Sequence, residues 1–105
     1  MYRQGDVLLL PIRHPVSGTA RPAQAGRLIL MYGEVTGHHH SVPVQSGVAV
    51  LDAPDGTTYL SIDALLGSVE LTHQEHATIS LPAGTYRIVR QREWTDAEEP
   101  RQVRD

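Results

Sequence analysis

The stretch GVAVLDAPDGTTYLSI (residues 47–62) indicates a β-hairpin. Its two arms, 47–52 and 57–63, are short runs of apolar, β-branched and aromatic residues, which favour strands. Between the arms, APDG (53–56) has proline at the first central position of a four-residue turn and glycine at its end. The stretch therefore predicts two neighbouring strands joined by a tight turn.

The same alternation of short apolar runs and turn residues continues outward from this hairpin, and no apolar stripe of helical period interrupts it. Many short strands at such spacing are typical of an all-β sandwich or small barrel, here of about eight mainly antiparallel strands. Besides the hairpin arms, we expect strands near residues 5–12, 26–32, 38–44, 68–73, 76–81 and 84–93.

A chain of 105 residues is long enough for one domain with a modest core. We predict a single β domain over residues 1–94 and a charged C-terminal tail over 95–105. Residues 13–26 are rich in proline and glycine and lack any period, which predicts a long loop.

Composition and charge exclude several classes of protein. The chain has no cysteine, which excludes disulfides and thiolate metal sites. A net charge of −3 argues against nucleic-acid binding. The longest apolar run, VLLLPI (7–12), is far shorter than the roughly 20 residues that span a bilayer. The sequence shows no basic segment followed by an apolar one, as a secretory signal would have. We therefore expect a soluble, cytoplasmic, bacterial-type protein without a membrane partner.

The histidines are clustered: five of the six lie in VTGHHHSV (35–42) and LTHQEHATISL (71–81). Side chains of a strand alternate between its faces, so His38 and His40 share one face with Val42 and Val44. The valines predict that this face points inward, and that His39 points outward. An H-x-H pair on one strand can give a metal ion two imidazole ligands.

The second histidine segment allows two conformations. In an unbroken strand, His73 and Glu75 face the interior together. If the chain instead turns at Gln74–Glu75, His73 and His76 come together, and Glu75 becomes a carboxylate beside the ligands or a catalytic group. Gln-Glu is neither a strong turn signal nor a strong strand signal, so both conformations stay open.

Buried imidazoles and carboxylates destabilise an aliphatic interior unless they satisfy one another, and a divalent ion does this in one step. Imidazole nitrogen and carboxylate oxygen suit zinc, iron, manganese or nickel. We therefore predict a metal site whose ion acts as Lewis acid or water activator on a small polar substrate. The predicted ligands are His38, His40 and either His73 or His76, and the predicted general base is Glu75 or, as a weaker candidate, Glu34.

Three metal-free interpretations compete with this prediction. The histidines can form a structural hydrogen-bond network, act as an acid–base pair, or switch protonation near pH ~6. A further alternative is an interaction module, either a homo-oligomer or an accessory subunit, in which the histidine clusters are structural or pH-sensing.

The segments GEVTGHHH (33–40), HQEH (73–76) and PAGTYRIVRQREW (82–94) resemble a family of small, uncharacterised bacterial and phage-associated β-proteins. That family carries G-E-x-T-G-H-x-H, then H-x-E-H, then G-x-Y followed by Q-R-E and an aromatic residue. The resemblance does not imply any particular activity. It singles out Glu34, Thr36, Gly37, His38, His40, His73, Glu75, His76, Gln91, Arg92 and Glu93.

A weaker similarity links the chain to cupins, which are metal-binding β-barrels. His38-x-His40 and Pro82-x-Gly84 are similar to pieces of the two cupin motifs. The spacing departs from that pattern, because no glutamate follows the H-x-H pair and Arg87 stands where a histidine would follow P-x-G.

Overall fold

The computed structural model describes residues 1–33 and 37–91, which form ten strands and one 3₁₀ turn and confirm the all-β class. The elements are β1 (Tyr2–Gln4), β2 (Val7–Ile12), β3 (Thr19–Ala20), β4 (Arg27–Tyr32), β5 (His39–Pro43), β6 (Val48–Asp52), β7 (Thr58–Ile62), η1 (Ala64–Leu66), β8 (Ser68–Leu71), β9 (Ile79–Pro82) and β10 (Gly84–Arg90). Glu34, Thr36, Arg92, Glu93 and the predicted tail 95–105 lie outside the described residues.

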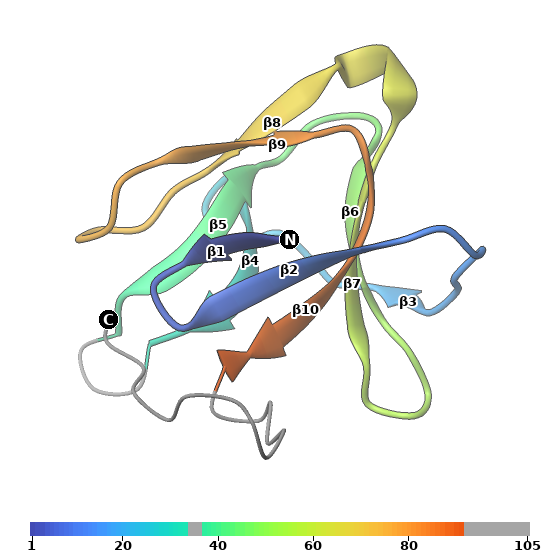
Figure 1. Cartoon of the computed structure of the whole chain (residues 1–105), viewed down its shortest axis with the longest axis horizontal. Helices are drawn as coiled ribbons and strands as arrows, with labels where there is room; N and C mark the ends of the chain where they lie inside the picture. The colour runs from blue at the N-terminus through green and yellow to red at the C-terminus, as the bar shows by residue number, and fades with distance from the viewer. Residues whose placement is uncertain (34–36, 92–105) are drawn as a thin grey trace.

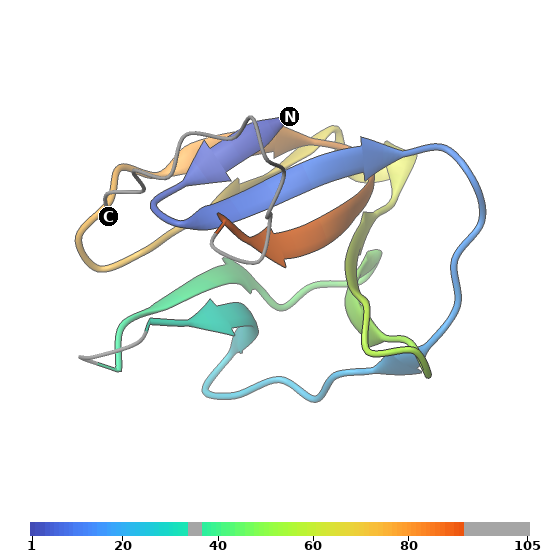
Figure 2. The same cartoon turned by 60° about the horizontal axis from the view of Figure 1, so that its bottom comes forward.

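Six strands form one antiparallel sheet in the order β1-β2-β10-β7-β6-β3, and β4–β5 and β8–β9 form two hairpins (Figure 1). The β4–β5 hairpin lies across from β2 and β10, and β6 and β7 pass from one layer to the other (Figure 2). An antiparallel bridge between Ser41 and Thr72 joins the two hairpins. The described strands do not close into a barrel, so the closed small barrel that was one of the two expected architectures is not seen.

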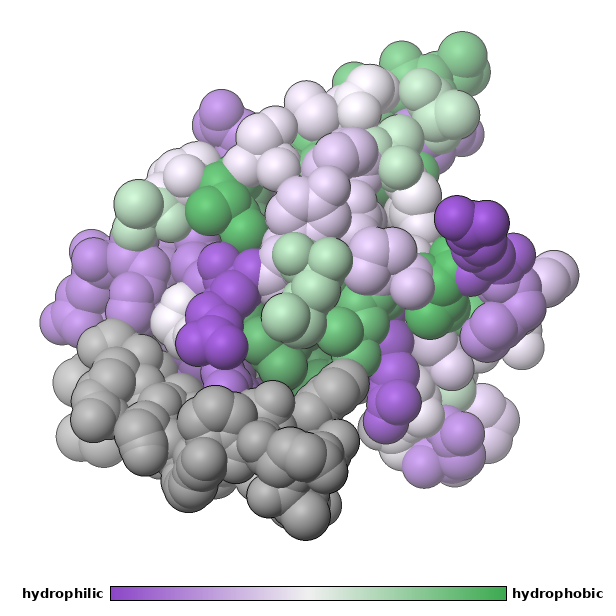
Figure 3. All heavy atoms as spheres, in the orientation of Figure 1, coloured by the Kyte–Doolittle hydropathy of each residue, from purple (hydrophilic) through white to green (hydrophobic). Residues whose placement is uncertain are grey.

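The core between these layers is mainly aliphatic, because the chain has no phenylalanine, and Tyr86 is its buried aromatic member. Both the six-stranded sheet and the two hairpins contribute side chains to this core. Leu9, Leu60 and Leu71, for example, are fully buried. On the face drawn in Figure 3, apolar residues gather over β2 and β10 inside a more hydrophilic margin. The cross-strand pair Leu8 and Val89 is buried outside the central core cluster.

The hairpin predicted from residues 47–62 is confirmed as β6–β7, with Val50 opposite Leu60. Gly56 N–H donates to the Ala53 carbonyl over 3.0 Å, which closes the APDG turn.

Several predicted strand bounds are wrong for local reasons. The strand expected at 5–12 begins only at Val7, because Gly5, with a φ of +59°, lies in the turn between β1 and β2. The loop expected at 13–26 contains the short β3. Val44, predicted to face inward, is 46% exposed because β5 ends at Pro43. In the described part of the chain, no helix has the length and apolar character needed to cross a membrane.

The interior of residues 71–81 is a turn and not a strand. Strand β8 ends at Leu71 and β9 begins only at Ile79, so the unbroken-strand conformation is wrong and the turning alternative is correct. Seven residues, 72–78, therefore form a loop that extends from the hairpin toward β5.

Leu71 and Leu65 offer a matched test of this core. Leu71 is fully buried at the end of β8, whereas Leu65 in η1 is 93% exposed. Leu71→Ala should lower the free energy of unfolding by about 2–5 kcal/mol through lost burial and a residual cavity. Leu65→Ala should change it by less than about 0.5 kcal/mol. Urea denaturation followed by circular dichroism measures both, and equal losses would contradict the placement of Leu71.

Candidate metal centre

All four histidines that were predicted as candidate ligands lie close together between β5 and the 72–78 loop. The ring centroid of His73 lies 5.6 Å from that of His38, 4.4 Å from that of His40 and 4.6 Å from that of His76. The centroids of His40 and His76 are 6.2 Å apart, with nearly parallel rings. Residues separated by more than 30 positions in the sequence thus form one cluster.

His40 is the most buried member of the cluster, with 2% of its surface exposed. Its Nδ1 lies 2.8 Å from Oε1 of Gln4. The Gln4 amide nitrogen donates to the carbonyls of Leu71 and Ala77 over 2.8 and 2.9 Å, so the amide oxygen is the end that faces His40. Because that oxygen can only accept, the neutral His40 ring carries its proton on Nδ1 and has its lone pair on Nε2.

The lone pair of His40 faces a carboxylate. Nε2 of His40 lies 3.8 Å from Oδ1 of Asp6. The other oxygen of Asp6 accepts a hydrogen bond of 2.6 Å from Nη1 of Arg90, and Nη2 of Arg90 donates to the Tyr32 carbonyl over 2.7 Å. Arg90 therefore holds Asp6 in place and leaves one carboxylate oxygen directed at the cluster.

A proton on Nε2 would relieve this contact, but the surroundings of His40 oppose it. Burial lowers the pKa of His40 from 6.5 to about 4, and the nearby His73 adds to the effect, while Asp6 acts in the opposite direction. Near neutral pH the ring is thus neutral, with a lone pair and a carboxylate oxygen facing each other. Such a gap suits a cation.

His73 and His76 differ in what their nitrogens can do. Nδ1 of His73 accepts hydrogen bonds from the backbone N–H groups of Glu75 and His76, at 3.0 and 3.3 Å. The neutral His73 ring therefore carries its proton on Nε2 and is a donor there. Among the described residues, His76 makes no side-chain hydrogen bond, and the Nε2 edge of its ring packs against Gly5. Of the two rings, only that of His76 has both nitrogens outside any hydrogen bond made among the described residues.

Gly5 also has a steric role at this point. A Cβ atom added to Gly5 would lie 2.6 Å from Nε2 of His76, closer than real Cβ contacts. The positive φ of Gly5 and the lack of room for a side chain beside His76 therefore both require glycine at this position.

His38 and Glu75 form the outer part of the cluster. Nδ1 of His38 lies 3.5 Å from Oε2 of Glu75, and the two side chains are 28% and 67% exposed. A carboxylate at Nδ1 favours the tautomer whose lone pair is on Nε2, as at His40. His39 lies on the other face of β5, as predicted, where it contacts Gln74.

The centroids of His40 and His76, two of the candidate ligands, are 6.2 Å apart, which is wider than the spacing around a shared metal ion. With metal–nitrogen bonds of about 2.1 Å in a tetrahedral site, two imidazole centroids lie roughly 5 Å apart. In residues 1–33 and 37–91, no group of three His, Asp or Glu side chains is preassembled as a metal-binding set. Binding of an ion would therefore require side-chain rotations within the cluster.

Sequence reasoning missed the residues that surround the histidines. Gln4, Gly5 and Asp6 form the turn between β1 and β2, and Arg90 lies at the end of β10. A Gly-Asp pair before the apolar run VLLLPI signals a turn, but nothing local in the sequence indicates that this turn lies beside His40.

The depressed pKa of His40 predicts an acid-sensitive fold in metal-free protein. The unfolded chain takes up a proton at His40 near pH 6.5, whereas the folded chain does so only near pH 4. The free energy of unfolding should therefore fall by up to about 3 kcal/mol as pH decreases across this window, and stay constant above it. Urea titrations at each pH measure this slope. His40→Gln should reduce it and His14→Gln should not; an unchanged slope in His40→Gln would contradict the assignment.

Comparison with known proteins identifies a family but no activity. No curated protein and no solved structure matches the chain. A family model described as a domain of unknown function, DUF8820, matches residues 3–91, which include all four clustered histidines and the turn that supports them. The resemblance to an uncharacterised family is thereby confirmed at that level, and the chain belongs to the DUF8820 family.

Proposed function

We propose that this protein binds a divalent transition-metal ion through His38, His40 and His76, with the Asp6 carboxylate facing the ion. The observation that carries the proposal is the environment of His40. Its Nδ1 is committed to Gln4, and its Nε2 lone pair lies 3.8 Å from a carboxylate oxygen. A neutral imidazole nitrogen and a carboxylate oxygen that face each other are a suitable ligand pair for a cation.

The supporting residues match the way proteins hold metal-bound histidines. A ligating histidine usually donates its other ring N–H to a carbonyl or carboxylate, which fixes the tautomer. Gln4 does this for His40, and Glu75 lies at the corresponding nitrogen of His38. This donor set of imidazoles and carboxylate suits zinc, iron, manganese or nickel.

The cluster has one buried and one open side, as a centre that admits a substrate requires. Asp6 and His40 lie inside, while His38 and Glu75 reach solvent. A bound ion would supply Lewis acidity or an activated water to a small polar substrate. Glu75 could then serve as general base from the open side, and His73 presents an N–H donor beside the centre.

A metal-free histidine network is the second candidate. It is favoured by the direct ring contacts of the cluster and by the two backbone hydrogen bonds that His73 accepts. In that case the histidines would hold the 72–78 loop against β5. The interaction-module alternative and the bacterial, cytoplasmic setting stay predictions.

Elemental mass spectrometry on protein purified without an affinity tag distinguishes the two candidates. We expect about one equivalent of a single transition metal, or uptake of one equivalent on titration. His40→Ala should abolish binding, and His39→Ala is the matched control because it removes a neighbouring histidine from the opposite face of the same strand.

Protein that contains no metal, and that binds none of zinc, iron, manganese or nickel when titrated while folded, would overturn the metal proposal. Equal binding by wild type and His40→Ala would place any metal at another site.

The orienting role of Gln4 gives a separate prediction. Gln4→Leu removes the acceptor for His40 Nδ1 and leaves the Leu71 and Ala77 carbonyls without their donor. Metal affinity should fall about 10–100-fold, and the free energy of unfolding by about 1–3 kcal/mol. Gln24→Leu, which replaces an exposed glutamine bonded to Tyr32, should change neither. Competition with a chromogenic chelator measures the affinity, and wild-type affinity in Gln4→Leu would contradict the role.

A further inference from the structure

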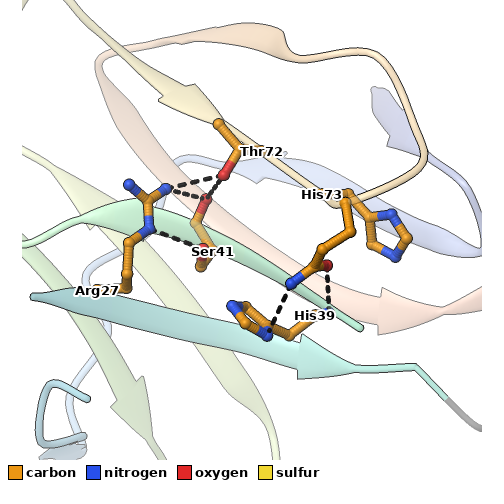
Figure 4. A pocket seen from close by; sticks show the side chains of 6 residues that line it. Arg27, His39, Ser41, Thr72 and His73 are labelled. Atoms are coloured by element: carbon orange, nitrogen blue, oxygen red, sulfur yellow. Dashed lines mark hydrogen bonds between the residues drawn. The ribbon is translucent and has the colours of Figure 1, made fainter. Parts of the chain in front are cut away.

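A polar pocket of about 300 Å³ lies between β5 and the 72–78 loop, on the side of β5 that carries His39 and Ser41 (Figure 4). The 72–78 loop covers this face, which explains why Ser41, on the outward side of the strand, is nevertheless buried. The pocket is lined by Arg27, His39, Ser41, Thr72, His73 and Gln74. None of these six residues is acidic.

Arg27 supplies a fixed positive charge at the pocket. Its Nε donates to Ser41 Oγ over 2.9 Å, and its Nη2 donates to the Ser41 carbonyl and to Thr72 Oγ1 over 3.1 and 2.9 Å. Within the described part of the chain, Nη1 has no acceptor and the guanidinium has no carboxylate partner. Arg21, by contrast, is paired with Asp52.

Two further donors at the pocket remain available. Ser41 Oγ accepts the Arg27 Nε–H, so its own proton points elsewhere, and no described residue accepts it. The Gln74 side-chain oxygen accepts the backbone N–H of His39, so its amide nitrogen donates to His39 Nδ1 over 3.3 Å. The neutral His39 ring therefore carries its proton on Nε2, as a donor.

The pocket thus combines neutral donors with a guanidinium that has no carboxylate partner among the described residues, and the Ser41, Thr72 and Gln74 side-chain oxygens each already accept a hydrogen bond. We propose that this pocket binds the carboxylate group of a small molecule. A single guanidinium matches the single charge of a carboxylate and can donate to it from a fixed position. The volume is at the lower end for small-molecule sites, which favours a compact ligand.

The pocket and the histidine cluster share His73, which lines the one and contacts the rings of the other. A carboxylate held at Arg27 would therefore place the rest of a small molecule next to the proposed metal centre. This role as a substrate anchor rests on the proposed function, whereas the carboxylate site itself does not require a metal.

Titration of chelator-treated, metal-free, ¹⁵N-labelled protein with sodium acetate tests the site directly, with sodium chloride to hold ionic strength constant. We expect saturable shifts of backbone amide signals from His39, Ser41 and residues 72–74. Arg27→Gln should weaken acetate binding by at least about tenfold. Arg87→Gln, which removes an exposed charge from β10, should leave it unchanged.

Three results of the acetate titration would overturn the proposal. They are amide shifts that do not saturate, equal acetate binding by wild type and Arg27→Gln, and tighter binding of inorganic phosphate than of acetate. If Arg27→Gln does not fold, His39→Ala retains the guanidinium and should still weaken acetate binding; unchanged binding there would also overturn it. Because no metal is present, failure of the metal centre cannot produce these results.

Discussion

The contact between the side chains of Gln4 and His40 is the interaction on which the rest of the site depends. Gln4 lies at the end of β1 and is almost fully buried. Its amide donates to the Leu71 carbonyl, just before the 72–78 loop, and to the Ala77 carbonyl within it, and accepts from a ring on β5. An amide is suited to this position because it has two donors and an acceptor on one planar group. One side chain thereby links three parts of the fold and fixes the tautomer of His40.

The 72–78 loop creates two different environments on the two faces of β5. On the inward face, its histidines meet His38 and His40 and enclose a lone pair and a carboxylate. On the outward face, Thr72 and Gln74 lie beside Ser41 and His39, and Thr72 accepts a hydrogen bond from Arg27. The alternation of side chains along a strand separates the two chemistries by only a few ångströms. A cation site and an anion site side by side would suit one small molecule held at both ends.

Local patterns in the sequence predicted the features that depend on local physics. The APDG turn, the β6–β7 hairpin and the outward direction of His39 follow from turn chemistry and the two-residue period of a strand. The conformation of residues 71–81 could not be decided, because its cause is distant. The loop is held by Gln4, 67 and 73 positions away from the carbonyls it binds. The sequence did not predict the positions of Asp6 and Arg90 or the pocket at Arg27 for the same reason. Hydrophobic periodicity does not show which strands become neighbours.

The proposed metal centre depends most directly on the tautomer and charge of His40, and long-range ¹H–¹⁵N NMR of the histidine side chains measures both. In metal-free protein at neutral pH, we expect a neutral ring with a proton on Nδ1 and a lone pair on Nε2. Added Zn²⁺ should then shift the Nε2 resonance strongly and leave Nδ1 protonated. A proton on Nε2, whether in the other neutral tautomer or in a charged ring, would contradict the proposal, because the His40 nitrogen nearest Asp6 would then have no lone pair for an ion.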